Sequence, residues 1–160
     1  MERDKSDYGV TPPGVARELS GREFLQAIAE GRLPAAPITQ HLPFQLAAVG
    51  DGFAVFEGQP DEGVYNPFGS VHGGFAMTML DSALACAVQS TLPKGLVCST
   101  LETKVNMIAA MTRKTGRVRA EGHVVHVGRT TGVAAGSLTD NRGKVLAHAT
   151  STCLIFPIED

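Results

Sequence analysis

The stretch His72-Gly-Gly-Phe-Ala-Met-Thr-Met-Leu-Asp81-Ser-Ala-Leu-Ala-Cys-Ala-Val88 decides the fold of this chain. From Phe75 to Val88 it is apolar on nearly every side when drawn as a helix, which is typical of a helix enclosed by other structure. Pro93 and Gly95 follow it and stop a helix from continuing. The sequence therefore predicts one long central helix with the rest of the chain packed around it.

Asp81 is the one acid inside this apolar helix. Burying a carboxylate without partners costs several kcal/mol, so such an Asp is paired, lies at a wet cleft or takes part in chemistry. At about 100° per residue, the small and polar residues of the helix fall on one stripe instead of scattering. The stripe, which we expect to form one wall of a pocket, consists of Gly74, Thr78, Asp81, Ser82 and Ala85.

His72, Gly73 and Gly74 stand where the helix begins. Two glycines at this point would leave backbone N–H groups uncovered at the positive end of the helix dipole, a site suited to a developing oxyanion. At roughly 1.5 Å of rise per residue, however, Gly73 and Asp81 lie about 12 Å apart along the axis. If both act on one carbonyl, two subunits must build the site, and a two-fold dimer would do so twice.

The remaining chain predicts an antiparallel sheet. Phe44–Val49 and Phe53–Gly58 flank Gly50-Asp51-Gly52 like a hairpin. Four further runs rich in Val, Thr and Ile read as strands, and the last three form a meander; they are Val97–Ile108, Gly116–Val127, Thr130–Asp140 and Lys144–Phe156. A long helix amid such strands is an α+β layout, with the sheet curling around the helix.

The first 40 residues read as an N-terminal arm, and residues 41–160 as the main domain. Residues 1–19 show little periodicity and are expected to be loose. Ser20 and Glu23 match a capping box that opens a short helix ending at Gly31.

Composition limits the classes of function. With 160 residues and 43% hydrophobic content the chain can bury a sizeable core, and its net charge of −2 gives no basic footprint for nucleic acid. No apolar run resembles a secretory signal or spans a bilayer, so we expect a cytoplasmic protein without a membrane partner. Three cysteines, an odd number without metal-type spacing, read as buried reduced thiols; they are Cys86, Cys98 and Cys153.

No metal site or cofactor is expected. His123 and His126 lie three apart in a predicted strand, which would place them on opposite faces and argues against joint ligation of a metal.

Four motifs carry a family resemblance: Asn66-Pro-Phe-Gly-Ser-Val-His72-Gly-Gly, Thr78-Met-Leu-Asp81, Leu101-Glu-Thr-Lys-Val-Asn106 and Gly128-Arg129-Thr130. Together they resemble the hotdog-fold acyl-CoA thioesterases of the phenylacetate-degradation type, which are also similar to one class of 4-hydroxybenzoyl-CoA thioesterases. The resemblance covers roughly residues 44–156. It implies a hotdog fold, an antiparallel sheet wrapped around a long helix, with homodimers that often pair into homotetramers and active sites between subunits.

The resemblance also implies roles for the catalytic residues. Asp81 would act as general base on water or as nucleophile toward the thioester carbon. The Gly73 amide would hold the thioester oxygen, Asn66 would orient the carbonyl or the water, and His72 would fix the helix start by hydrogen bonding. A hydroxyl that helps to place the water would come from Thr100 or from its neighbour Ser99.

Other positions would contact the substrate. The stripe residues Gly74, Thr78 and Ser82 would line the site, and Arg129 with Thr130 would lie near the pantetheine path, where a solvent-facing cation suits a phosphate. The chain departs from the common family pattern at Ala109-Ala110, where many relatives have a proline.

Three functions remain open on these residues. The first is hydrolysis of an acyl-CoA, with an aryl or medium-chain acyl group facing an apolar lining of Phe68, Phe75, Met77 and Met79. The second is hydration or dehydration of an acyl thioester, which calls for a His beside an acid, whereas only His72 is present and at the far end of the helix. The third is a module that senses acyl-CoA without turning it over, against which the retained Asp81 argues.

Overall fold

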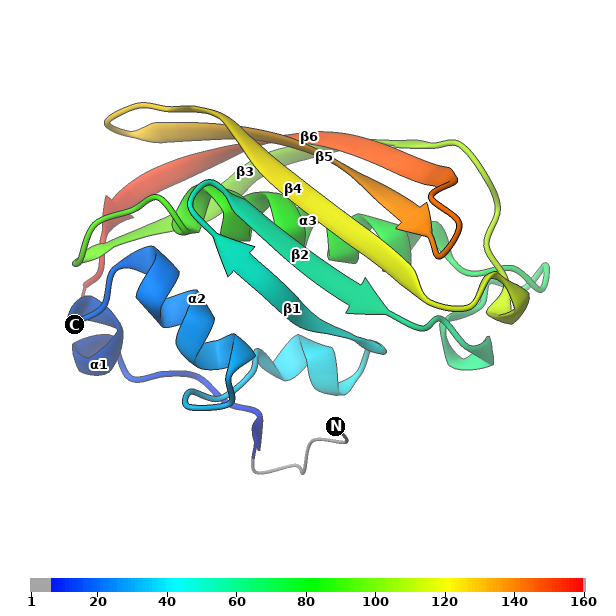
Figure 1. Cartoon of the computed structure of the whole chain (residues 1–160), viewed down its shortest axis with the longest axis horizontal. Coiled ribbons are helices and arrows are strands. Elements are labelled where there is room, and N and C mark those ends of the chain that lie inside the picture. The colour runs from blue at the N-terminus through cyan, green and yellow to red at the C-terminus, as the bar shows by residue number, and fades with distance from the viewer. Residues whose placement is uncertain (1–6, 160) are drawn as a thin grey trace.

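The computed structural model describes residues 7–159, and it has an α+β architecture. A six-stranded antiparallel sheet, in the order β1-β2-β4-β5-β6-β3, packs across one long helix, α3 (Gly73–Gln89), as Figure 1 shows. The strands are β1 (Phe44–Gly50), β2 (Phe53–Gly58), β3 (Leu96–Met107), β4 (Val118–Val127), β5 (Thr131–Asp140) and β6 (Val145–Pro157). The predicted central helix, hairpin and meander are therefore confirmed.

The helix α3 supplies the centre of the core and contacts all of the strands. Met79, Leu80, Ala83 and Leu84 are completely buried beneath the sheet. Gly122 in β4 allows an unusually close approach, because a Cβ atom added there would lie 2.5 Å from the carbonyl oxygen of Ala83. Backbone therefore meets backbone at the middle of α3, which fixes the rotation of the helix about its own axis.

Residues 7–40 pack against this core. They contain α1 (Pro13–Arg17), α2 (Gly21–Ala29) and a 3₁₀ turn, η2 (Pro37–Gln40). The capping box predicted for α2 is present, since Ser20 Oγ accepts from the Glu23 N–H and the Glu23 carboxylate accepts from the Ser20 N–H. The expectation of a loose segment up to residue 19 is wrong over Pro13–Arg17, and residues 1–6 lie outside the described part of the chain.

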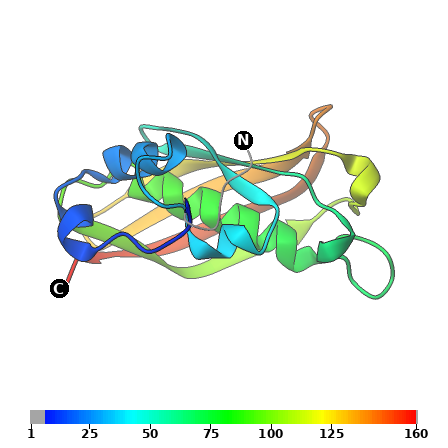
Figure 2. The ribbon, with the colours of Figure 1, turned by 90° about the horizontal axis from the view of Figure 1, so that it is seen from below.

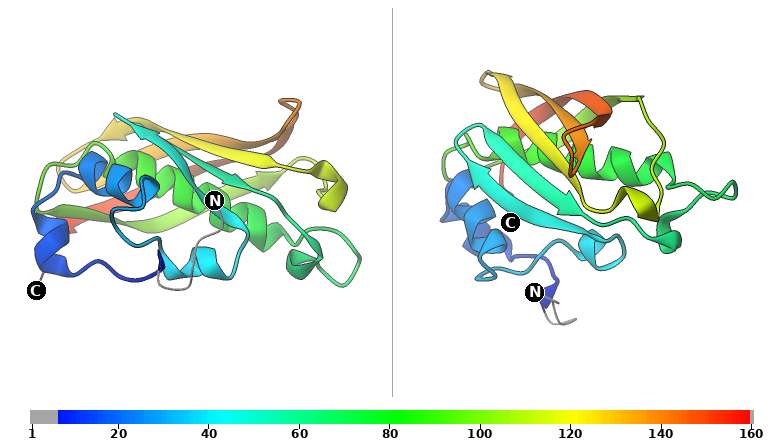
Figure 3. Two further views of the ribbon diagram at one scale, coloured as in Figure 1. Left: turned by 60° about the horizontal axis from the view of Figure 1, so that its bottom comes forward. Right: turned by 45° about the vertical axis from the view of Figure 1, so that its right-hand side comes forward.

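Viewed from below, α3 lies between the sheet and the N-terminal helices (Figure 2). The helices α1 and α2 lie beside the C-terminal half of α3 and leave its N-terminal half uncovered (Figure 3). Shorter 3₁₀ turns, η3 (Glu62–Val64) and η4 (Arg113–Thr115), lie beyond the other end of the sheet. No helix among residues 7–159 is both long and apolar enough to cross a membrane.

A β-bulge in β4 overturns the expectation for the two strand histidines. His123 pairs with Ala135 and His126 with Val133, two residues apart on β5, because the register shifts between Val124 and His126. Both imidazoles therefore lie on the same outer face of the sheet, where they are exposed. His123 Nε2 lies 2.8 Å from a Glu121 carboxylate oxygen, and no group of three metal-ligating side chains occurs among the described residues.

Candidate active site

The polar stripe on α3 is the one face of the helix that the core does not bury. Its five residues, Gly74, Thr78, Asp81, Ser82 and Ala85, are all half-buried, whereas the residues between them are mostly buried. Asp81 therefore lies at an edge of the core that water can reach, as a working carboxylate requires.

One oxygen of Asp81 is held by a threonine from the sheet. Thr103 Oγ1 in β3 donates a 2.8 Å hydrogen bond to Asp81 Oδ1. The same hydroxyl lies 3.1 Å from Ser151 Oγ, whose own proton goes to the carbonyl oxygen of Glu102 at 2.8 Å. Because Thr103 has a single proton and a carboxylate is the stronger acceptor, the bond to Asp81 fixes the rotamer of the acid and leaves its second oxygen for other partners.

The hydroxyl that holds Asp81 comes from Thr103, a residue that the sequence does not single out, and the water-placing role expected of Thr100 or Ser99 stays a prediction. The register of β3 shifts between Thr100 and Glu102, so Thr100 pairs with Cys153 and Thr103 with Ser151, both of which are buried inner-face residues of β6. Ser99 is exposed and pairs with Leu154 on the outer face. Strict alternation would have put Thr100 and Thr103 on opposite faces, and the bulge at Leu101 is the reason that it fails.

At the start of α3, His72 acts as the N-cap residue. Its Nδ1 accepts a 2.9 Å hydrogen bond from the Gly74 N–H, as the resemblance implied for a residue that fixes the helix start. This contact corrects one expectation, because the Gly74 amide is covered. The Gly73 N–H has no acceptor among the described residues. Of these two amides, only that of Gly73 can therefore donate a hydrogen bond to a ligand oxygen.

Asn66 organises the loop before the helix. Its Oδ1 accepts from the backbone N–H groups of Phe68 at 2.9 Å and Ser70 at 3.3 Å, and its Nδ2 donates to Ser70 Oγ at 2.9 Å. The loop tip carries Phe68, which is 95% exposed. Within one chain, Asn66 therefore shapes the loop, and one hydrogen of its amide remains for a ligand.

The remaining positions differ in what they offer. Thr78 spends its hydroxyl proton on the Gly74 carbonyl at 2.8 Å, and no partner of the Ser82 hydroxyl occurs in the described chain. Arg129 and Thr130 are exposed in the turn before β5, and no carboxylate within residues 7–159 pairs with Arg129. Gly132, just beyond this turn, lies against Val88, so the turn is beside the C-terminal end of α3.

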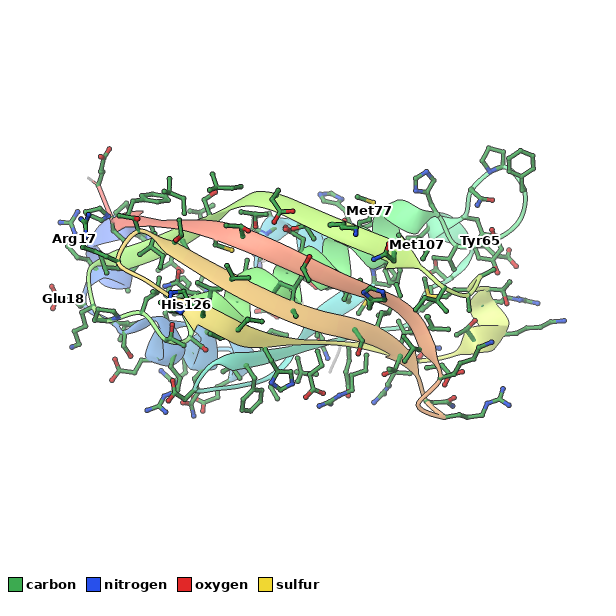
Figure 4. All side chains as sticks on the ribbon, turned by 90° about the horizontal axis from the view of Figure 1, so that it is seen from above. Arg17, Glu18, Tyr65, Met77, Met107 and His126 are labelled. Carbon is green, nitrogen blue, oxygen red and sulfur yellow. The ribbon has the colours of Figure 1, made fainter. Side chains whose placement is uncertain are left out.

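The apolar side chains proposed as a lining divide into two groups. Phe75 and Met79 are buried in the core, so they do not line an open site. Met77 is 47% exposed, and Figure 4 labels it on the same half of the molecule as Met107 and Tyr65. The terminal carbon of Met107 lies 3.4 Å from the Cβ position of Gly73. The side chain of Met107 therefore borders Gly73, whose amide is free.

The three cysteines lie together between α3 and the strands β3 and β6, and all are free thiols, as expected. Cys98 Sγ donates to the carbonyl of Ala85 at 3.4 Å. Burial, with a smaller contribution from the Asp81 carboxylate, raises the pKa of Cys86 to about 12. Interaction with the neighbouring Cys153 thiol, together with burial, raises the pKa of the Cys98 thiol. Both of these thiols therefore stay protonated at neutral pH.

One chain does not bring Gly73 and Asp81 together. The helix is continuous between them, so the separation of about 12 Å expected from its rise stands. The sheet ends at β3, which carries Thr103, and this edge strand exposes Leu101 and Met107. Its outer edge has backbone groups free to pair with a second strand.

Comparisons with known proteins identify the family of the chain. The sequence profile of the thioesterase superfamily matches residues 68–147, which include α3 and the Asp81–Thr103 pair. A 1,4-dihydroxy-2-naphthoyl-CoA hydrolase of Listeria monocytogenes is 25% identical over 118 residues, 74% of this chain and 94% of its own length.

Solved structures give the same result. A phenylacetic acid degradation-related protein of Ralstonia eutropha superposes with a TM-score of 0.74 at 28% identity, over 82% of this chain and 98% of the other. A hypothetical thioesterase of Streptococcus pneumoniae, determined with coenzyme A, superposes with a TM-score of 0.65 at 26% identity, over 73% and 91%. The expected hotdog fold is thus confirmed.

Proposed function

Because this chain belongs to the thioesterase superfamily, we propose that it hydrolyses an acyl-CoA thioester, with an aryl or medium-chain acyl group, to the free acid and coenzyme A. The Listeria relative is named for the hydrolysis of an aryl-CoA, and the Streptococcus structure contains coenzyme A. The observation that carries the proposal is the Thr103–Asp81 hydrogen bond, which orients a carboxylate on the open stripe of α3.

In the proposed reaction, Asp81 takes a proton from water while the water oxygen attacks the thioester carbon. The resulting tetrahedral oxyanion accepts a hydrogen bond from the free Gly73 N–H of a second copy of the chain. Collapse of the intermediate breaks the carbon–sulfur bond, and the proton held by Asp81 passes to the departing thiolate. Such paired base and oxyanion contributions account for large rate enhancements without any redox step.

Asp81 has a second possible role, attack on the carbonyl carbon by its own oxygen. An anhydride would form as coenzyme A leaves, and water would then hydrolyse it. In both routes Thr103 occupies one carboxylate oxygen and leaves the other to react. The two routes differ in the source of oxygen. A single turnover in ¹⁸O-water labels Asp81 only if the carboxylate is the nucleophile and water opens the anhydride at the Asp81 carbonyl.

We propose further that the active unit is a homodimer, or a tetramer made of two dimers. The exposed edge of β3 and the separation of Gly73 from Asp81 support this arrangement. A symmetric pair would build two equal sites, each with the acid of one chain and the amide of the other.

The alternatives find less support. A hydratase needs a histidine near the acid, and His72 lies at the start of α3 with its Nδ1 bound to the Gly74 amide. A sensing module has no need of an oriented carboxylate.

The test is release of free thiol from a panel of acyl-CoAs by wild-type protein and by Asp81→Asn. General-base contributions predict a fall in kcat of at least about a hundredfold. Asp51→Asn, at an exposed acid in the β1–β2 turn, is the matched control and should keep full turnover. Unchanged turnover in Asp81→Asn would contradict the mechanism, and a change in enoyl absorbance without thiol release would indicate a hydratase.

A further inference from the structure

The helices α1 and α2, outside the segment matched by the thioesterase profile, are fastened beside the C-terminal end of α3. The Gly21 N–H donates to the Leu92 carbonyl at 2.9 Å, and Arg17 Nη2 donates to the Ile158 carbonyl at 3.1 Å. A Cβ atom at residue 21 would lie 1.7 Å from the carbonyl oxygen of Gln89, so only glycine permits this approach. These contacts hold the two helices in a defined place rather than as a loose tail.

Between these helices and α3 lies an open cavity of about 220 Å³. Ala16 of α1, Leu19 of the connection and Phe24 of α2 line one side of it. Ala85, Cys86 and Cys98 form the opposite wall. A smaller cavity of about 80 Å³ shares Leu25 and Cys86 with it. The N-terminal helices therefore close one side of an apolar space that the sheet and α3 alone would leave open.

The lining suits an apolar ligand. None of the lining residues carries a charge. The polar atoms of Gln89, the one lining residue with a polar amide, are already bound, because its Oε1 accepts from the Cys98 N–H at 2.9 Å and its Nε2 donates to the Leu96 carbonyl at 3.2 Å. A polar or charged group in this cavity would therefore find few partners.

The cavity begins one helical turn from the acid. Ala85 follows Asp81 by four residues on the same half-buried stripe, a rise of about 6 Å. A group bound with its reacting carbon at Asp81 thus meets the cavity directly along the helix. The influence of the Asp81 carboxylate on the pKa of Cys86, in the cavity wall, agrees with this short separation.

We propose that this cavity receives the acyl group of the substrate, with α1 and α2 as the wall that sets its length and width. The inference rests on the function proposed above. The cavity is smaller than the roughly 300–1,000 Å³ of sites that enclose a whole small ligand, so it takes the acyl part and not coenzyme A. Since a cavity of about 150 Å³ holds benzene, the substrates are esters of a single substituted aromatic ring or of an aliphatic chain of similar volume.

The test fills the cavity from α1. Ala16→Phe should lower kcat/KM for benzoyl-CoA and octanoyl-CoA at least about tenfold, while acetyl-CoA stays within about twofold, as steric exclusion predicts. Val15→Phe is the matched control, because Val15 is adjacent on α1, 46% exposed and not part of the lining. It should leave all three substrates unchanged.

A second variant works in the opposite direction. Leu19→Ala enlarges the cavity and should raise the ratio of kcat/KM for dodecanoyl-CoA over octanoyl-CoA, a gain that misfolding cannot produce. Equal effects of Ala16→Phe on acetyl, benzoyl and octanoyl esters would overturn the inference. The inference would also be overturned if Ala16→Phe lowered kcat/KM for every CoA ester but not for the corresponding N-acetylcysteamine esters. The cavity would then hold the pantetheine arm of coenzyme A.

A binding readout separates this inference from the proposed function. Calorimetry of octanoyl-CoA and acetyl-CoA on Asp81→Asn, with and without Ala16→Phe, needs no turnover. Selective weakening of octanoyl-CoA supports the acyl cavity even if wild-type protein releases no thiol, a result that would end the hydrolase proposal alone. Equal affinity for both esters in Asp81→Asn, with no selective effect of Ala16→Phe, would contradict the acyl cavity.

Discussion

Thr103 in β3 and Asp81 in α3, twenty-two positions apart in the chain, are joined by a 2.8 Å hydrogen bond from hydroxyl to carboxylate. The bond crosses from the edge strand of the sheet to the open stripe of the central helix. The bond therefore links β3, which we expect to meet a second subunit, to Asp81, which we expect to act on the substrate. The position of that strand therefore bears directly on the orientation of the acid.

Removing the hydroxyl should slow the reaction without unfolding the protein. Thr103→Val keeps the shape of the side chain and loses the donor. A hydrogen bond to a charged group is worth about 1.5–3 kcal/mol, so we expect kcat to fall by about tenfold or more with little change in KM. Steady-state kinetics with thermal melts check this. Thr103→Ser keeps the donor and should stay within about threefold of wild type, and an equal loss in Ser and Val variants would assign a packing role to the methyl group instead.

Two inactive chains should restore each other if the site is shared. We expect Asp81→Asn and Gly73→Leu homodimers each to be inactive. Co-expressed with different tags and purified through both, the hybrid has one intact site and one doubly altered site, so it should recover about half of the wild-type rate per dimer. Thiol release measures the recovery. No recovery in a stable hybrid would place the acid and the amide of one site in the same chain.

His72 should tolerate substitution by another N-cap residue. His72→Asn can still accept the Gly74 N–H, whereas His72→Ala cannot and should lower the free energy of unfolding by about 1 kcal/mol. Chemical denaturation and kinetics of both variants separate the roles. If the Asn variant is as stable as wild type and yet inactive, then His72 takes part in proton transfer, as a hydratase would require.

The position of Gly21 should be sensitive to a single methyl group. Gly21→Ala forces a Cβ atom toward the Gln89 carbonyl and should cost about 1–3 kcal/mol of unfolding free energy. Gly14→Ala is the control, because Gly14 in α1 has no neighbour within 4 Å of the added Cβ atom. In a helix that change should be neutral or stabilising by up to about 1 kcal/mol. Equal melting temperatures for the two variants would show that α2 does not depend on this contact.

Sequence reasoning succeeded where the signal is local. The apolar run of α3, the Gly50-Asp51-Gly52 turn and the capping box of α2 each depend on neighbours within a few residues, and all three are confirmed. The common face of Gly74, Thr78 and Asp81 follows from helical periodicity alone, which the regular helix preserves.

It failed where distant contacts decide. The bulges at Leu101 and Val125 shift the alternation of β3 and β4, so counting by two gives the wrong face for His126 and does not show that Thr100 and Thr103 share a face. The short helix α1 has five residues and depends on contacts such as that between Arg17 and Ile158. No local sequence pattern predicts the two bulges or α1, because they depend on contacts with residues distant in the sequence.

The contact between Gly122 and the backbone of Ala83 has a consequence for how such a protein can diversify. A scaffold in which sheet and helix touch without an intervening side chain cannot roll the helix to aim its acid at a new target. A change of substrate preference is then expected to come from elements at the periphery, of which α1 and α2 are the nearest to the cavity. Altering α1 and α2 is therefore a more promising route to altered substrate preference than redesigning α3.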